Sequence, residues 1–206
     1  MQRLLFIFGL TLLSGSIATA QEKSPKYKLT VPEGWKSEVI VLPPVFAKEM
    51  TWKGIEDIRF APGMFKANSD SFFSYTILFW LPGKQNVDAK SLQREFLRYY
   101  QGLAKAVSAG KISGEEFDVK FHPVKSKAKP EMRDGDPVRS FVGEMKWVEP
   151  FVTRKKQTLY LDVQSWYCAK AKRQVVFICV SPQEKKAAIW QQMHKIRAGF
   201  RCVGKK

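Results

Sequence analysis

The sequence predicts an α+β fold, in which an antiparallel sheet of roughly six to eight strands is packed by a central helix (89–109) and a C-terminal helix (182–198). Three observations predict it. Short apolar runs bounded by Pro, Gly, Asn or Asp recur along the chain, which is typical of strands. The apolar spacing changes twice to a helical period. Most connections between successive strands are short enough for antiparallel pairing.

The first 20 residues have the pattern of a secretory signal peptide. Arg3 supplies the positive charge, residues 4–13 form the apolar region, and residues 18–20 (Ala-Thr-Ala) form a small-residue cleavage site. A membrane anchor is the alternative, but a bilayer-spanning helix takes about 20 apolar residues. We therefore expect a secreted or periplasmic protein with no transmembrane segment after cleavage, in which residues 21–206 form a single globular domain.

The strands before the central helix differ in character. Residues 55–60 alternate, with Ile55, Asp57 and Arg59 on one face, so one side of this strand is predicted to meet solvent or a polar site. Residues 72–81 are the most apolar run after the signal and predict a central strand buried on both faces, between the two helices. The full set of predicted strands is 27–31, 37–42, 55–60, 72–81, 116–124, 138–148, 158–168 and 175–181, of which the last three resemble a meander.

Both helices carry terminal signals. Asp88 is the expected N-cap of the central helix and Gly110 its C-terminal stop. Gly102 lies inside this helix, costs about 1 kcal/mol relative to Ala, and is expected to allow close packing on the sheet. Ser181, followed by Pro, Gln and Glu184, reads as a capping box that starts the C-terminal helix at residue 182.

Three cysteines leave the pairing open between several arrangements. A C-terminal helix running back along the preceding strand brings Cys202 near the start of that strand, and Cys168 lies across the turn from there. We therefore favour a Cys168–Cys202 disulfide, with Cys179 as a small core residue. A bridge that involves Cys179, or no bridge at all, are the alternatives.

Residues with catalytic potential are few. The best polar constellation is Glu56, Asp57 and Arg59, since two carboxylates near an arginine can serve acid/base work. Such residues are more often an internal ion pair or a solvated strand face, so no catalytic residue is assigned. If the protein has a binding site, these three residues are where we expect it. His122 and His194 lack metal-ligand spacing, so neither a metal nor a cofactor is predicted. His122 is expected at the surface or a sheet edge, and His194 at the rim of the apolar face of the last helix.

A strong positive charge raises the affinity of a protein for anionic partners. The formal charge is +16, or about +15 without Arg3 of the signal. Lipid headgroups and acidic polysaccharides are therefore possible partners, whereas nucleic acid is not the favoured one. The alternative is a generally basic, solvated surface. The clusters favour that alternative because each lies in a predicted loop or chain end: Lys125, Lys127 and Lys129; residues 154–156; residues 170–173; residues 185–186; and residues 205–206.

At the level of element order the chain resembles the PsbP-like fold. The resemblance rests on the strand end Val-Pro-Glu-Gly-Trp at 31–35, the central helix, the meander over 138–181, and the closing helix followed by Phe200. It implies a non-enzymatic accessory or binding module. The lysine-rich loop 125–137 and the three cysteines depart from it.

Two functional hypotheses follow. The first is an exported, non-catalytic module that binds an unknown protein or assists assembly at the cell envelope. The second is a cationic binder of an anionic polymer or membrane surface. A hydrolase is the third and weakest reading, because it needs a cleft that contains Glu56, Asp57 or Arg59 with perturbed pKa values.

Overall fold

The computed structural model describes residues 27–125 and 129–204. The predicted signal peptide and its cleavage site lie outside these residues, as does Lys127 of the lysine-rich loop. No helix in the described part is long and apolar enough to cross a membrane.

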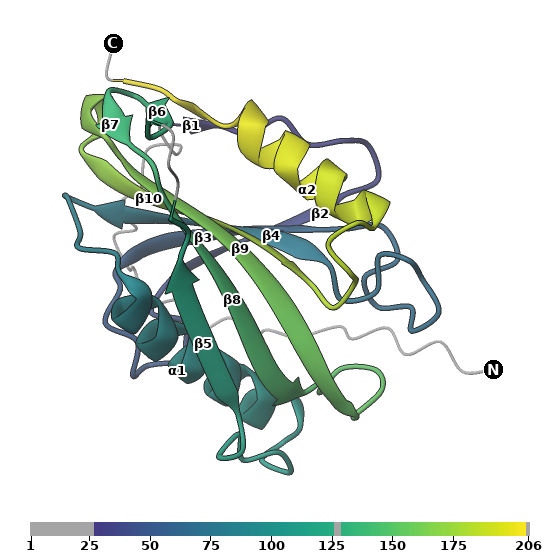
Figure 1. Cartoon of the computed structure of the whole chain (residues 1–206). Helices are drawn as coiled ribbons and strands as arrows, with labels where there is room; N and C mark the ends of the chain where they lie inside the picture. Colours follow the sequence, from purple (N-terminus) through teal and green to yellow (C-terminus); the bar gives the residue numbers. More distant parts are fainter. Residues whose placement is uncertain (1–26, 126–128, 205–206) are drawn as a thin grey trace, which may run out of the picture.

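Seven strands form one antiparallel sheet in the order β2-β3-β4-β10-β9-β8-β5 (Figure 1). This confirms the predicted α+β class and strand number. The strands are β2 (Lys36–Leu42), β3 (Gly54–Phe60), β4 (Tyr75–Pro82), β5 (Asp118–Pro123), β8 (Arg139–Val148), β9 (Lys156–Cys168) and β10 (Arg173–Ser181). Two further pairs lie outside this sheet, β1 (Tyr27–Lys28) with β11 (Arg201–Cys202) and β6 (Met132–Arg133) with β7 (Asp136–Pro137).

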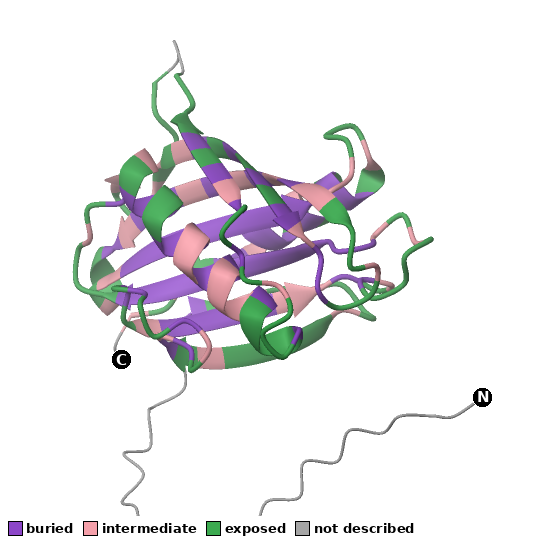
Figure 2. Cartoon of the chain, turned by 90° about the horizontal axis from the view of Figure 1, so that it is seen from below, coloured by how far each residue is buried: buried purple, intermediate pink, exposed green. Residues whose placement is uncertain are grey.

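The two helices, α1 (Ala89–Val107) and α2 (Ala188–Gly199), cover opposite faces of the sheet (Figure 1). Each helix packs into a separate hydrophobic cluster, with Phe96 and Tyr100 of α1 in the larger one and Trp190 and Met193 of α2 in the smaller. The sheet is therefore the middle layer, and Figure 2 shows the buried residues concentrated along its central strands.

Strand β4 contributes to both clusters. Ile77 and Phe79 face α1, whereas Leu78 and Trp80 face α2, and all four are buried. The predicted central strand is thus confirmed, but it starts at Tyr75. Phe73, predicted to be in the strand, has a φ of 50° and belongs to the preceding turn.

Helix α1 begins as predicted. The Asp88 side chain accepts a hydrogen bond from the Ser91 backbone N–H at 2.8 Å, and the Ser91 hydroxyl accepts one from the Asp88 backbone N–H at 2.9 Å. The helix ends at Val107, just before Gly110. Gly102 was predicted to allow close packing on the sheet, but it packs closely on the loop after β2 instead. A Cβ at this position would collide with the Phe46 carbonyl oxygen.

Helix α2 begins at Ala188 and not at residue 182, so the predicted capping box was wrong. Ser181 is still paired with Tyr160 as the last residue of β10, and the chain must turn before it can enter a helix. The Ser181 hydroxyl hydrogen-bonds with the Ser74 hydroxyl at 2.7 Å and accepts from the Gln183 N–H. Both Ser181 bonds therefore stabilise the strand end and its turn.

The predicted disulfide is confirmed. Cys168, the last residue of β9, is bonded to Cys202 of β11, with the two Cα atoms 6.3 Å apart. Cys179 is free and fully buried in β10. The bridge fixes the chain end after α2 to the sheet.

Candidate functional site

A cavity of about 440 Å³ opens beside the edge strand β2 on the α1 face of the sheet, and we call it the aromatic cleft. Its size falls within the range of roughly 300–1,000 Å³ that is usual for ligand sites. Strands β2 and β3, helix α1 and the loops after β3 and β8 contribute to it. Its apolar walls include Ile40, Phe46, Ile58, Phe60, Leu103 and Phe151.

Two of the aromatic walls are partly open to solvent. Phe65 is 50% exposed and Phe151 is 38% exposed. Their ring centroids lie 5.6 Å apart, and Phe151 also contacts the buried Phe73 at 5.8 Å. Exposing large aromatic rings to water is unfavourable, so this rim suits contact with an apolar molecule.

The polar groups of the cleft are of two kinds, exposed side chains on β2 and buried tyrosines. Lys36, Ser37 and Glu38 are exposed on β2. Tyr75 and Tyr99 are buried, and burial raises the pKa of both phenols well above the usual value. Both tyrosines therefore stay neutral at physiological pH, and the Tyr75 hydroxyl is already hydrogen-bonded to the Tyr100 hydroxyl.

Glu56 does not line the cleft itself but lies beside residues that do. Its register neighbour on β2 is Ile40, and Ile58 follows on the same face of β3. The side chain is fully buried, and this burial raises its pKa to about 8. The Tyr99 hydroxyl is close enough to lower this pKa in part, but neither Glu56 oxygen completes a hydrogen bond in the structure.

Asp57 and Arg59 lie on the opposite face of the sheet from Glu56, because alternate residues of a strand point to opposite sides. Asp57 accepts hydrogen bonds from the Tyr27 hydroxyl at 2.6 Å and from Arg59 at 2.7 Å. Burial raises the pKa of Asp57 although Tyr27 and Arg59 act to lower it. The structure thus separates the three predicted site residues into an internal ion pair and a single carboxyl group near the cleft.

Most of the residues that form the cleft were not singled out as site residues from the sequence. Tyr99 appeared only as part of the apolar stripe of α1. Phe65 and Phe151 lie in turn-rich segments far apart in the chain. An aromatic residue inside a turn-rich segment is the signal that could have identified them, since such a side chain has no strand or helix face on which to be buried.

A larger cavity, of about 920 Å³, lies between the start of α1 and the segments around β5 and β8. The lining residues that are buried, Val87 and Phe141, are both apolar. Between its lining residues Val124 and Lys129 the chain includes residues 126–128, which the structure does not describe. It therefore offers no buried polar group for recognition among the described residues.

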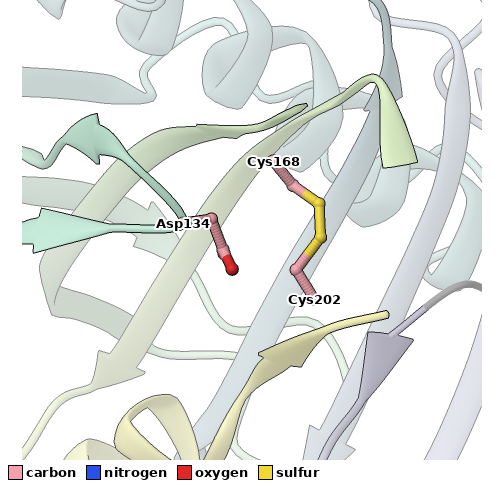
Figure 3. Close-up of side chains that lie close together, drawn as sticks. All are labelled: Asp134, Cys168 and Cys202. Atoms are coloured by element: carbon pink, nitrogen blue, oxygen red, sulfur yellow. A yellow bond between two sulfur atoms is a disulfide. The ribbon is translucent and has the colours of Figure 1, made fainter. Parts of the chain in front are cut away.

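Asp134, Cys168 and Cys202 are close together in space (Figure 3), with potential ligand atoms all within 4.8 Å of one another. The two sulfur atoms are bonded to each other, so neither is a thiolate that could bind a metal. The Asp134 carboxylate accepts a hydrogen bond from the Trp166 indole N–H at 3.2 Å. Residues 134–135 form the turn between β6 and β7.

A second polar cluster connects α2 to β9. Asp162 accepts hydrogen bonds from Arg197 at 3.1 Å, and its Oδ2 lies 2.8 Å from His194 Nε2. Burial acts to raise the pKa of Asp162, but His194 and Arg197 outweigh it and hold this pKa well below its usual range. The cluster fixes the helix on the sheet. His122 is exposed on the edge strand β5.

Comparison with known proteins shows likeness of fold only. No family model matches the sequence. No curated protein matches it either. Among solved structures, the chain is similar to cyanobacterial PsbP from Synechocystis sp., with 10% identity and a TM-score of 0.40, over 86% of this chain and 87% of that one. It is also similar to the Ran-binding protein Mog1p of Saccharomyces cerevisiae, with 14% identity and a TM-score of 0.39, over 87% and 91%.

A PsbP protein is thus among the structures that this chain resembles, as its element order predicts. At these identities the likeness concerns the fold alone. The function has to be argued from the residues of this chain.

Proposed function

We propose that the protein is an exported, non-catalytic binding module of the cell envelope, and that it holds an apolar molecule, or the apolar part of one, in the aromatic cleft. The observation that carries the proposal is the cleft itself, in which partly exposed Phe65 and Phe151 border a cavity of about 440 Å³ with mainly apolar walls. Ligand sites are typically cavities of this kind, with a few polar groups that orient the ligand.

The polar groups around the cleft support binding over catalysis. Its described lining contains neither histidine nor cysteine. Ser37, which carries a hydroxyl group, lies on the exposed edge strand. Tyr75 and Tyr99 cannot act as bases, because their raised pKa values keep the phenols protonated. Of the three residues that acid/base chemistry would use, Asp57 and Arg59 are paired on the other face, so Glu56 alone adjoins the cleft.

Export is supported by the signal-like first 20 residues and by the Cys168–Cys202 disulfide. Disulfides persist in oxidising compartments and are rare in the cytosol. The partner that supplies or receives the apolar molecule is an unknown protein or another envelope component.

Binding of N-phenyl-1-naphthylamine, an uncharged dye that fluoresces in apolar sites, tests the proposal. We expect saturable binding to the wild-type protein and its loss in Leu103→Trp, because the larger ring fills the cleft. Leu29→Trp is the matched control, since Leu29 is also half-buried but packs against the α2-side cluster. If Leu103→Trp is folded by circular dichroism and still binds the dye as the wild type does, the proposal is wrong.

The net charge of +16 supports a second candidate, a cationic binder of an anionic polymer or membrane surface. A test of this candidate has to compare the basic clusters at different places on the molecule.

A further inference from the structure

Glu56 is the buried carboxylate to which the described residues complete no hydrogen bond, although the Tyr99 hydroxyl lies close enough to influence its pKa. Among the described residues it is the one carboxylate with both oxygens buried and free of hydrogen bonds. Two other glutamates, Glu95 and Glu149, are equally buried, but both accept several hydrogen bonds from backbone N–H groups. The carboxylates of Glu95 and Glu149 are therefore hydrogen-bonded by backbone N–H groups, whereas that of Glu56 is not.

An unpartnered buried polar group lowers the stability of a protein. A native structure seldom contains such a group without a reason, and a role in ligand binding is one such reason. Glu56 adjoins the cleft through Ile40, Ile58 and Tyr99, all of which line it.

We propose that Glu56 and Tyr99 form the polar end of a binding site for an uncharged molecule with an apolar body and one carbonyl group. The body fills the aromatic cleft, and the carbonyl oxygen accepts hydrogen bonds from the protonated Glu56 carboxyl group and the Tyr99 hydroxyl. This inference rests on the proposed function and names the ligand class of the same site.

The protonation states of both groups favour an acceptor over a cation. With its pKa raised to about 8 by burial, Glu56 is mainly a neutral acid at pH 7 and can donate a hydrogen bond. Tyr99 is a neutral donor over the same range. A cationic ligand would instead have to enter an apolar cavity in a protein of net charge +16.

Several other ionisable groups face Glu56 from the neighbouring elements. Glu38 of β2 raises the Glu56 pKa further through its negative charge. Tyr75 of β4 and Tyr100 of α1 interact with Glu56 as well, and burial raises the pKa of both phenols. They remain neutral where Glu56 titrates, so loss of the Glu56 proton is the change expected to weaken carbonyl binding as the pH rises above about 8.

Displacement of N-phenyl-1-naphthylamine by two competitors tests the inference, with 1-acetylnaphthalene as the carbonyl compound and 1-ethylnaphthalene as its analogue without the oxygen. At pH 7 we expect the wild type to prefer the acetyl compound by about three- to tenfold, the value of a typical hydrogen bond. The preference should fall between pH 7 and pH 9.5.

Two substitutions distinguish the effect of the protonated Glu56 carboxyl group on binding from the effect of the apolar cavity. Glu56→Gln keeps a neutral donor, so it should retain the preference at both pH values. Glu56→Leu removes the donor and should bind both competitors equally. If Glu56→Leu does not fold, the pH profile of Glu56→Gln decides alone.

The results that would contradict the role of Glu56 differ from those that would contradict the proposed function. If Leu103→Trp abolishes dye binding while Glu56→Gln shows the same pH-dependent preference as the wild type, the role of Glu56 is wrong and the cleft remains a binding site. Absence of any acetyl preference in the wild type also overturns the inference. If Leu103→Trp binds the dye normally, the cleft is not the site and the proposed function fails.

Discussion

Single buried carboxylates position the loops that surround the cleft. Glu95 of α1 accepts hydrogen bonds from the Thr51 backbone N–H at 2.7 Å and from the Thr51 hydroxyl at 2.8 Å, and Arg94 donates to it at 2.8 Å. Thr51 belongs to the segment between β2 and β3, which also carries Phe46 to the cleft wall. One side chain of the helix thereby holds this segment against the helix.

Glu95→Gln is expected to lower the free energy of unfolding by about 1.5–3 kcal/mol at pH 7, the range for hydrogen bonds to charged groups. Burial acts to raise the pKa of Glu95, but the bonds from Thr51 and Arg94 outweigh it and the pKa lies below its ordinary value. A folded-state pKa below the unfolded one stabilises the protein above the unfolded pKa, and this stabilisation is lost as the pH falls through the folded value.

Urea unfolding at pH 7 and at pH 3 measures the effect, and the difference between wild type and variant should narrow at the lower pH. Glu116→Gln is the control, because the Glu116 side chain is 81% exposed. A constant difference at both pH values would show that the charge of Glu95 is not the source of the stability.

Short elements at the two chain ends depend on the disulfide. Strands β1 and β11 have two residues each and pair only with one another. Such a pair is marginal without further support. Cys202 of β11 is bonded to Cys168 of β9, so the bridge connects this pair to the main sheet and places Tyr27 beside Asp57.

Cys202→Ser is expected to lower the free energy of unfolding by about 3–4 kcal/mol, as the loop-closure relation gives for a sequence separation of 34 residues. Thermal unfolding with and without a thiol reductant measures it. In reductant the wild type should unfold at the same temperature as the variant. The unfolding temperature of the variant should not change when reductant is added. Cys179→Ala should keep the reductant response, and its loss there would reassign the bridge.

Element boundaries show where local signals were outweighed by pairing. Asp88 caps α1 as its local sequence predicts, because no neighbouring strand competes for it. Ser181 has an equally good capping sequence, yet its backbone is held in the ladder with Tyr160. The helix therefore starts only at Ala188, without a side-chain cap.

On the scale of the whole molecule, the positive charge is spread over both ends of the sheet. Residues 154–156 lie at the turn that enters β9, and residues 170–173 at the turn that leaves it. Strand β9 has 13 residues, so these turns are about 40 Å apart. That separation exceeds the Debye length of about 8 Å at physiological salt, so the two clusters act independently.

Charge reversal at each end tests the second candidate function. Lys155→Glu and Lys170→Glu should lower retention on a heparin column by equal, small amounts if the basic surface is general. Retention of the wild type should then match that of unrelated proteins of equal charge. A much larger loss in one variant, with binding that falls steeply with salt, would support a specific anionic partner.

The sequence by itself determined the fold class, the central strand and the cap of α1, and it favoured the Cys168–Cys202 disulfide over its alternatives. Each of these depends on patterns that are local in the chain or on the simple return path of a helix along its strand. Glu56, Asp57 and Arg59 were also found, since charged residues inside an apolar strand stand out in any sequence.

Only the tertiary structure decided what those residues do. The pleat of β3 turns Glu56 toward Tyr99 of α1, while Asp57 turns to Tyr27 on the opposite face of the sheet. The cleft needs Phe46, Phe65, Tyr99 and Phe151 from four segments that are distant in sequence. A site made of such segments exists only once the sheet, the helix and the loops are packed, because burial and the absence of a partner are properties of the assembled core.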